Sequence, residues 1–309
     1  MKKHVSSILT MACFVLMIVV LIQNQGLKDQ IRQMENDISN RLYQVENSVN
    51  GITYNIETKL NEAAALLSSS KWRLGDVDVQ NGTVEALLTV VPKEYQPDKT
   101  NATIICNSTE YPMILKDGSY CAEITIPLYE ASQVESVGFE TNGVIRTEML
   151  NWEINPRYDV LPVVYAHYAG GASGSRRNGN YELSFDGEME VIVDQKEDSP
   201  RISAVELVEV LDGKEIGRQA VSGEMDTNGS FWFELEQKQV SFPYGSTYGM
   251  YVEVEDGYGL LHRAWAWREK ISETGEPVDD DHWWWRGAEG SIFSPDGEPL
   301  AVHDEEFFQ

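Results

Sequence analysis

The stretch KDGSYCAEI (116–124) joins an Asp-Gly pair to a short run with β-strand character. Both central residues of a type I′ turn need a positive φ, which Asn-Gly and Asp-Gly adopt most readily. Such pairs recur, with β-rich runs between and around them, at 81–82, 117–118, 142–143, 186–187, 212–213, 228–229, 256–257 and 296–297. The sequence therefore predicts that the chain after residue 70 is mainly β.

An internal repeat divides this β part. KDGSYCAEI (116–124) aligns with TNGSFWFEL (227–235), and VGFETNGVIR (137–146) resembles YVEVEDGYGLLHR (251–263). We expect two related domains, at 71–154 and 157–272, each ending in a hairpin. About a hundred residues with roughly seven short strands is the size of an immunoglobulin-like or fibronectin-like β-sandwich.

The second domain also carries a resemblance. The stretch YVEVEDGYG (251–259) resembles the penultimate strand and turn of bacterial immunoglobulin-like modules. The resemblance covers the fold class alone, because the cysteines of antibody domains are not matched. It implies an immunoglobulin-like sandwich and no family function.

The N-terminus predicts a membrane anchor. Residues 5–22 (VSSILTMACFVLMIVVLI) contain no charge and would span about 27 Å as a helix, close to the ~30 Å apolar core of a bilayer. A cleaved signal peptide would need a small-x-small site, which QNQGL (23–27) does not provide. We expect an uncleaved, single-pass signal anchor. Because Lys2 and Lys3 precede it, residues 1–4 are expected in the cytoplasm and the bulk of the chain outside the cell membrane.

Residues 23–70 predict a long helix. Its apolar positions follow one another at steps of three and four: Leu27, Ile31, Met34, Ile38, Leu42, Val45, Val49, Ile52, Ile56, Leu60, Ala63 and Leu67. A narrow stripe of this length favours a self-associating coiled-coil stalk. The alternative is a helix packed on its own domain.

The net charge of −26 limits the partners. It disfavours nucleic acid and anionic lipid headgroups, and it favours cationic partners or divalent ions. Cys106 and Cys121 lie on two strand-like runs, and in an oxidising compartment they would suit one disulfide. The alternative is a pair of buried free thiols.

No catalytic or metal-binding motif is present. The five histidines are not at metal-ligand spacing, and neither C-x-x-C, H-E-x-x-H nor G-x-S-x-G occurs. The acidic run Asp279–Asp281 lacks the spacing of a calcium loop and is more typical of a solvated linker. We therefore expect a protein that is not an enzyme and that has no cofactor and no metal.

Two segments are candidate binding sites. In YAGGASGSRRNGN (168–180), Arg176 and Arg177 would form either the tip of a mobile insert loop or a cationic contact finger. The acidic, tryptophan-rich tail 273–309 contains Trp283, Trp284, Trp285 and Arg286.

These tryptophans have two interpretations. In a strand, Trp283 and Trp285 would share one face and could pack on Trp265 and Trp267, which have the same spacing, while 290–307 forms another hairpin. The alternative is an exposed aromatic platform for sugars or a partner protein.

The sequence thus predicts a membrane-anchored, extracytoplasmic interaction protein for assembly, adhesion or scaffolding, of the kind found at a bacterial cell surface. Its partner would be an unidentified protein or polysaccharide. The alternatives are a carbohydrate- or cell-wall-binding accessory protein and the extracytoplasmic subunit of a sensor or transport complex.

Overall fold

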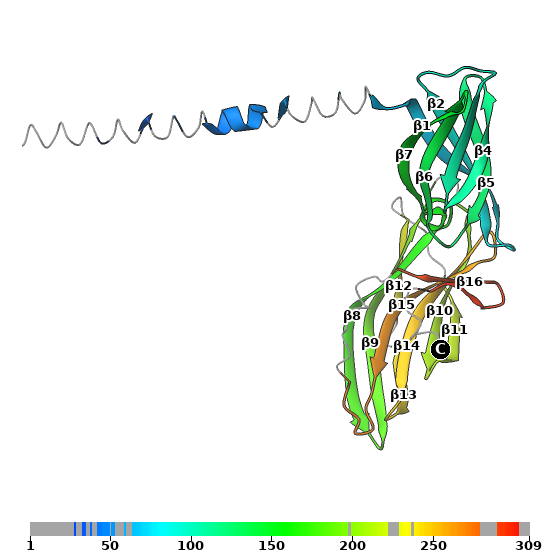
Figure 1. Cartoon of the computed structure of the whole chain (residues 1–309). Coiled ribbons are helices and arrows are strands. Elements are labelled where there is room, and N and C mark those ends of the chain that lie inside the picture. The colour runs from blue at the N-terminus through cyan, green and yellow to red at the C-terminus, as the bar shows by residue number, and fades with distance from the viewer. Residues whose placement is uncertain are drawn as a thin grey trace, which may run out of the picture. The chain divides into compact units, whose positions relative to one another are not determined.

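The computed structural model describes residues 28, 33–34, 38, 42–49, 51–52, 59, 64–196, 199–221, 229–235, 238–278 and 289–302. The chain forms two compact units, Met1–Leu66 and Leu67–Gln309. The second unit is built mainly of antiparallel strands, as predicted (Figure 1). The predicted anchor at 5–22 lies outside the described residues. Among those described, no helix combines the length and the apolar composition that a membrane crossing requires.

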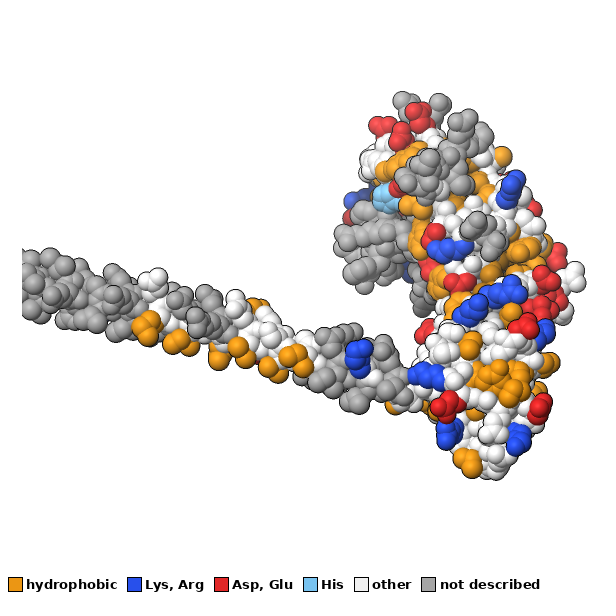
Figure 2. Space-filling model, turned by 90° about the horizontal axis from the view of Figure 1, so that it is seen from above, with side chains coloured by type: hydrophobic (Ala, Val, Ile, Leu, Met, Phe, Trp, Pro, Cys, Tyr) orange, Lys and Arg blue, Asp and Glu red, His pale blue; other side chains and the backbone are white. Residues whose placement is uncertain are grey.

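The first unit is helical at the described positions between 28 and 64. The described aliphatic and methionine side chains of this helix from Met34 to Ile52 are exposed, by 53 to 69%: Met34, Ile38, Leu42, Val45, Val49 and Ile52. Figure 2 shows hydrophobic side chains along one side of this helix. At these described positions the predicted stripe is therefore open to solvent within a single chain. Its last predicted member, Leu67, is buried in strand β1 (Leu67–Asp78), so the helix does not continue to residue 70 as predicted.

The first β region is a seven-stranded sheet with the order β1-β2-β5-β4-β3-β6-β7. Its strands are β1 (Leu67–Asp78), β2 (Thr83–Pro92), β3 (Thr100–Cys106), β4 (Thr109–Lys116), β5 (Ser119–Pro127), β6 (Ser132–Thr141) and β7 (Val144–Ile154). The sheet curls until its edge strands meet: the backbone N–H of Leu67 on β1 donates to the Glu148 carboxylate on β7 at 3.1 Å. Strand β4 makes the corner: its first half pairs with β3 and its last three residues pair with β5.

Alternate side chains of this curled sheet face each other inside it. Tyr120 of β5 donates its hydroxyl to the Thr100 carbonyl at 2.9 Å, and its ring meets that of Phe139 edge-on at 5.7 Å. The rest of this core is mostly aliphatic, with fully buried Leu88 and Ile104.

The second β region begins with the short helix α2 (Pro156–Val160) and forms two sheets. One sheet contains β8 (Val163–Arg177), β9 (Asn180–Asp194), β12 (Ser230–Leu235) and β13 (Gln239–Pro243). The other contains β10 (Ile202–Leu211), β11 (Lys214–Ala220), β14 (Thr247–Asp256), β15 (Leu261–Lys270), β16 (Ser291–Phe293) and β17 (Pro299–Ala301).

The same pairing order occurs in both regions. In the first region, β1-β2-β5 and β4-β3-β6-β7 follow one another; in the second, β9 lies between β8 and β12, and the other sheet runs β11-β10-β14-β15. The segments that align in sequence, 116–124 with 227–235 and 137–146 with 251–263, fall on corresponding strands. Residues 67–309 form one compact unit, so the division into domains at 71–154 and 157–272 stays a prediction.

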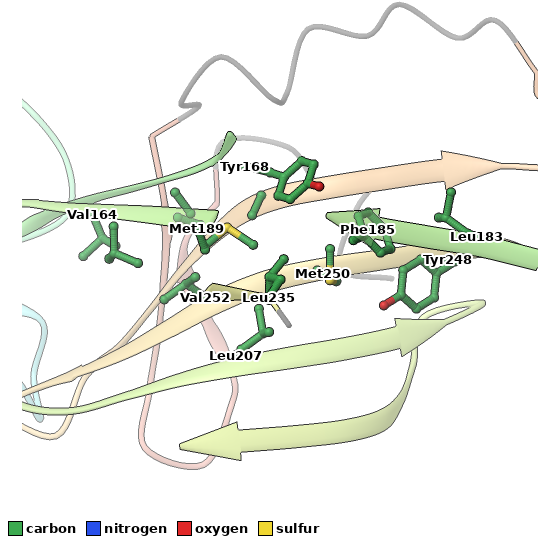
Figure 3. Close-up of a cluster of buried hydrophobic side chains, with 14 of the residues drawn as sticks. Val164, Tyr168, Leu183, Phe185, Met189, Leu207, Leu235, Tyr248, Met250 and Val252 are labelled. Carbon is green, nitrogen blue, oxygen red and sulfur yellow. The ribbon is translucent and has the colours of Figure 1, made fainter. Parts of the chain in front are cut away.

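Aromatic rings pack together with aliphatic and methionine side chains between the two sheets of the second region (Figure 3). Phe185 meets Tyr168 edge-on at 5.5 Å and Trp267 at 5.2 Å, and it is 1% exposed. Such pairs contribute roughly 0.5–1.5 kcal/mol beyond the area they bury.

The predicted shared face of Trp265 and Trp267 is wrong. Trp265 is opposite Tyr251 and Trp267 is opposite Met250, so a β-bulge inserts one residue between them. A bulge changes the alternation of side chains. Trp267 consequently packs in the core between the sheets, whereas Trp265 packs with Val208, Val210 and Tyr251. The C-terminal hairpin is confirmed, since β16 and β17 pair antiparallel.

The predicted disulfide is absent. Cys106 and Cys121 are free thiols. Cys106 is buried and points inward, as every second residue of β3 does. Cys121 points outward, between two inward residues of β5, and its Sγ lies 3.8 Å from the Thr89 hydroxyl. The two side chains therefore lie on opposite faces of the curled sheet and cannot meet. Burial raises the pKa of the Cys106 thiol, and Glu135 adds to this.

Candidate functional site

A groove of about 320 Å³ crosses the outward face of β4, β3, β6 and β7. Its floor is a row of small residues in register: Thr103 is opposite Gly138, and Gly138 is opposite Thr147. The hollow exists because Gly138 has no side chain. A Cβ built there would meet its nearest neighbours only at 3.9 Å, among them Ile145 and Thr147.

The next outward rows form the walls. On one side, Ile105 is opposite both Glu110 and Ser136; on the other, Glu140 is opposite both Asn101 and Ile145. Each wall thus combines an isoleucine with a carboxylate. The aliphatic part continues onto the edge strand β7, where Ile145 is 68% exposed and Met149 is 61% exposed.

Two carboxylates, those of Glu110 and Glu140, stand on the walls of the groove. Neither Glu110 nor Glu140 forms a salt bridge with any described residue. Both are exposed, as is Thr147 at the end of the floor. The site can therefore offer two free negative charges, aliphatic walls and hydroxyl groups to whatever enters it.

The corresponding face of the second region satisfies its own charges. On β14, Glu253 lies between Arg263 of β15, at 2.6 Å, and Arg218 of β11, at 2.5 Å, while Arg218 also contacts Glu206 and Glu215. The Arg263 guanidinium stacks over the Phe293 ring at 4.2 Å from its centroid.

These salt bridges shift the pKa values of Arg218 and Glu215. The hydrogen bonds that Arg218 donates to Glu215, Glu253 and Glu206 raise the pKa of Arg218 above its ordinary value, and the bond that Glu215 accepts lowers the pKa of Glu215. With its charges paired, this face offers little to an ionic partner.

The structure corrects the predicted loop at 168–180. Strand β8 continues to Arg177 and pairs with β9 along its whole length, with a turn at Asn178 and Gly179, both at positive φ. This Asn-Gly pair is a turn signal that the sequence carries and that the predicted loop overlooked. Arg176 and Arg177 therefore lie at the tip of a regular hairpin.

The two arginines have different surroundings. Arg176 pairs with Glu276 while staying 49% exposed, and Arg177 is 72% exposed and lies 4.0 Å from Glu182. The cationic contact finger stays a prediction.

Trp283, Trp284, Trp285 and Arg286 lie outside the described residues, as do Asp279–Asp281. The segments on either side are fixed to the second region. The Val278 N–H donates to the Lys270 carbonyl at 2.9 Å, and Glu289 pairs with Arg157 at 2.8 Å. Whether the tryptophans form core or platform stays a prediction.

A buried acid–histidine pair lies at the β14–β15 turn. Asp256 and His262 are each 1% exposed and contact each other at 2.9 Å. The other Asp256 oxygen accepts the backbone N–H groups of Tyr258 and Leu260, so this carboxylate holds the β14–β15 turn. Within the described ranges no three His, Cys, Asp or Glu residues gather where a metal ion could bind.

The groove was missed from the sequence. Its residues on β3 and β6 alternate with core residues, which is the pattern of any half-buried sheet. The one available signal was the run VIRTEML (144–150), in which Ile145 and Met149 share the outward face of a strand that follows an Asn-Gly turn. A comparison with protein-family models finds no match, and a comparison with curated protein sequences finds no significant match.

Proposed function

We propose that this chain is a membrane-anchored, extracytoplasmic interaction protein without enzymatic activity. It is anchored through residues 5–22, self-associates through its helix, and displays two immunoglobulin-like β-sandwich domains to a partner protein. Assembly, adhesion or scaffolding at a cell surface would all use these properties.

The strand order supports the immunoglobulin-like domains. In such sandwiches strands A, B and E share one sheet and strands C, F and G share the other, with C′ added beside C in variable-type domains. If β1 and β8 are taken as strand A, then β1-β2-β5 and β8-β9-β12 follow A-B-E. On the same basis, β4-β3-β6-β7 and β11-β10-β14-β15 follow C′-C-F-G.

The observation that carries the proposal is the exposed apolar stripe of the helix, represented by Ile38, Leu42, Val45 and Ile52. Aliphatic side chains recurring at steps of three and four on an otherwise polar helix are the seam of a coiled coil. Each buried side chain of this kind contributes about 1.5–3 kcal/mol, so a second helix on the stripe would hold two copies together.

Crosslinking tests this self-association. In Ile38→Cys protein, a short thiol-reactive crosslinker should give a covalent dimer or trimer at micromolar protein in native membranes, compared with the unsubstituted chain. The matched control is Asn47→Cys, because Asn47 is about 200° around the helix from Val45 and from Val49. A chain that stays monomeric with both substitutions contradicts the proposal.

A further inference from the structure

We infer that the groove on β4, β3, β6 and β7 binds an extended segment of a partner protein that carries two basic side chains. The inference rests on the proposed function, because it names the chemistry of the partner that an interaction protein would take. It assigns the binding surface to the first β region and not to the arginine hairpin of the second.

The shape of the groove favours a protein segment over a small molecule. Ligand pockets of about 300–1,000 Å³ usually enclose most of the ligand surface. This groove has a volume near the lower end of that range. It is shallow, because its walls at Glu110, Glu140 and Ile145 are exposed. Individual side chains that project from a larger partner can fill such a hollow, and the partner covers the rest of the face.

The charge of the groove selects a basic segment. Glu110 and Glu140 lack a salt bridge with any described residue, and the whole chain has a net charge of −26. A second copy of the chain would bring the same negative charge to this face, which disfavours it as the occupant. A lysine- or arginine-bearing segment is complementary.

The aliphatic walls match the stems of the same side chains. Lysine and arginine lay their methylene groups along apolar surface while the charged group stays at the polar rim. Here one stem would lie along Ile105 toward Glu110, and another along Ile145 toward Glu140, as the pairing of the strands places them. The Thr103 and Thr147 hydroxyls between them can bond to the backbone of the segment.

The register also sets the spacing of the two basic residues. The two wall rows are four residues apart along β3, about 13 Å, and Glu110 and Glu140 are two strands apart, about 10 Å. Along the diagonal the two positions are therefore about 16 Å apart. An extended chain advances about 3.3 Å per residue, so two lysines four residues apart lie about 13 Å apart on one face, and their flexible side chains span the remainder.

The experiment measures binding of a labelled synthetic peptide with the core Lys-Val-Thr-Val-Lys to the full chain in detergent micelles, by fluorescence anisotropy at low ionic strength. The comparison peptide has glutamates in place of both lysines and should not bind. Gly138→Val is the decisive variant, because it fills the floor and leaves every charge in place. It should weaken binding at least tenfold. The double variant Glu110→Gln with Glu140→Gln should weaken it at least as much.

Two controls separate binding in the groove from general charge attraction and from misfolding. Glu123→Gln removes an exposed carboxylate from β5, outside the groove, and should leave binding unchanged. Melting curves show whether Gly138→Val folds. If it does not, Thr147→Lys places a cation in the groove from the exposed edge strand and should also weaken binding tenfold.

The opposite results overturn the inference. Equal loss with Glu123→Gln would mean general attraction to an acidic protein. Unchanged binding in folded Gly138→Val would place the peptide elsewhere. A change in sedimenting mass in the groove variants, with unchanged peptide binding, would mean that a second copy occupies the groove. None of these results changes the crosslinking through Ile38→Cys, so the inference about the groove can be rejected while the proposed self-association of the helix is retained.

Discussion

Glu140 and Glu253 sit on strands that correspond in the two β regions, β6 and β14, and both project from the outward face. Glu140 is exposed and forms no salt bridge with a described residue, whereas Glu253 is 6% exposed and is held by two arginines. The pairing order of the strands is the same in both regions. The difference teaches that corresponding strands can carry faces with different chemistry, so binding has to be sought on the faces.

The hydrophobic cores of the two β regions also differ, in the kinds of side chain they contain. The first is mostly aliphatic and encloses few aromatic rings, whereas the second packs Tyr168, Phe185, Tyr248 and Trp267 between its sheets. Large rings bury more area per residue, so a single truncation should cost more in the second region.

The largest expected effect is on this aromatic core. Phe185→Ala removes a ring that packs against those of Tyr168, Tyr248 and Trp267 and leaves a cavity, so the free energy of unfolding should fall by about 4 kcal/mol. Ile104→Val in the fully buried core of the first region should cost about 1 kcal/mol. Urea unfolding of both variants measures the difference. Equal losses would mean that the aromatic core adds no stability of its own.

The next largest loss of stability is expected on the salt-bridged face of the second region, around Glu253. Glu253→Gln removes the nearly buried charge between Arg218 and Arg263, leaves two arginines without their shared partner, and should lower the free energy of unfolding by about 2–3 kcal/mol. Glu140→Gln, the matched change in the first region, should cost less than about 0.5 kcal/mol. Thermal melts at neutral pH compare the two. A large loss from Glu140→Gln would show that the groove carboxylate is structural and not free for a ligand.

Alkaline pH should weaken the second region through Tyr181. Burial, and then the nearby Glu269 carboxylate, raise the pKa of Tyr181 to about 12. Because the folded-state pKa exceeds the unfolded value near 10, the stabilisation is complete below pH 10 and is lost as the pH rises to 12.

After allowance for solvent screening, this loss is about 1–2 kcal/mol. In Tyr181→Phe the decline in stability between pH 10 and pH 12 should be shallower by that amount, as measured by urea unfolding at each pH. Tyr111→Phe, on a partly exposed tyrosine of β4, is the control and should leave the slope as it was. An unchanged slope in Tyr181→Phe would assign the alkaline sensitivity to other tyrosines.

The fold was largely predictable because its signals are local. Asn-Gly and Asp-Gly turns and alternating strands are set by neighbouring residues, and the repeat at 116–124 and 227–235 identified corresponding strands. The bulge between Trp265 and Trp267 was not predictable, because an inserted residue shows only once the register with β14 is known. The disulfide failed for a related reason: sequence spacing does not say which face a cysteine occupies.

The groove required more than strand assignment. Gly138 leaves a hollow only because Thr103 and Thr147 flank it on neighbouring strands, and that depends on pairing between segments far apart in sequence. The arginine pair and the tryptophan run were candidates because their local sequence is unusual. The groove residues are common residue types in ordinary strand sequences, so only their arrangement in the sheet identifies them.

The smallest effect is expected at the hairpin tip of the second region. Arg176 and Glu276 are both about half exposed, so their salt bridge should contribute less than about 1 kcal/mol, and Arg176→Ala should barely change the melting temperature. Arg177→Ala, at a residue that is 72% exposed, should change it even less. Because neither substitution should destabilise the fold, a loss of partner binding in these variants would mean that the arginines contact the partner. Such a loss, together with unchanged binding in Gly138→Val, would reverse the comparison and place the interaction on the second region.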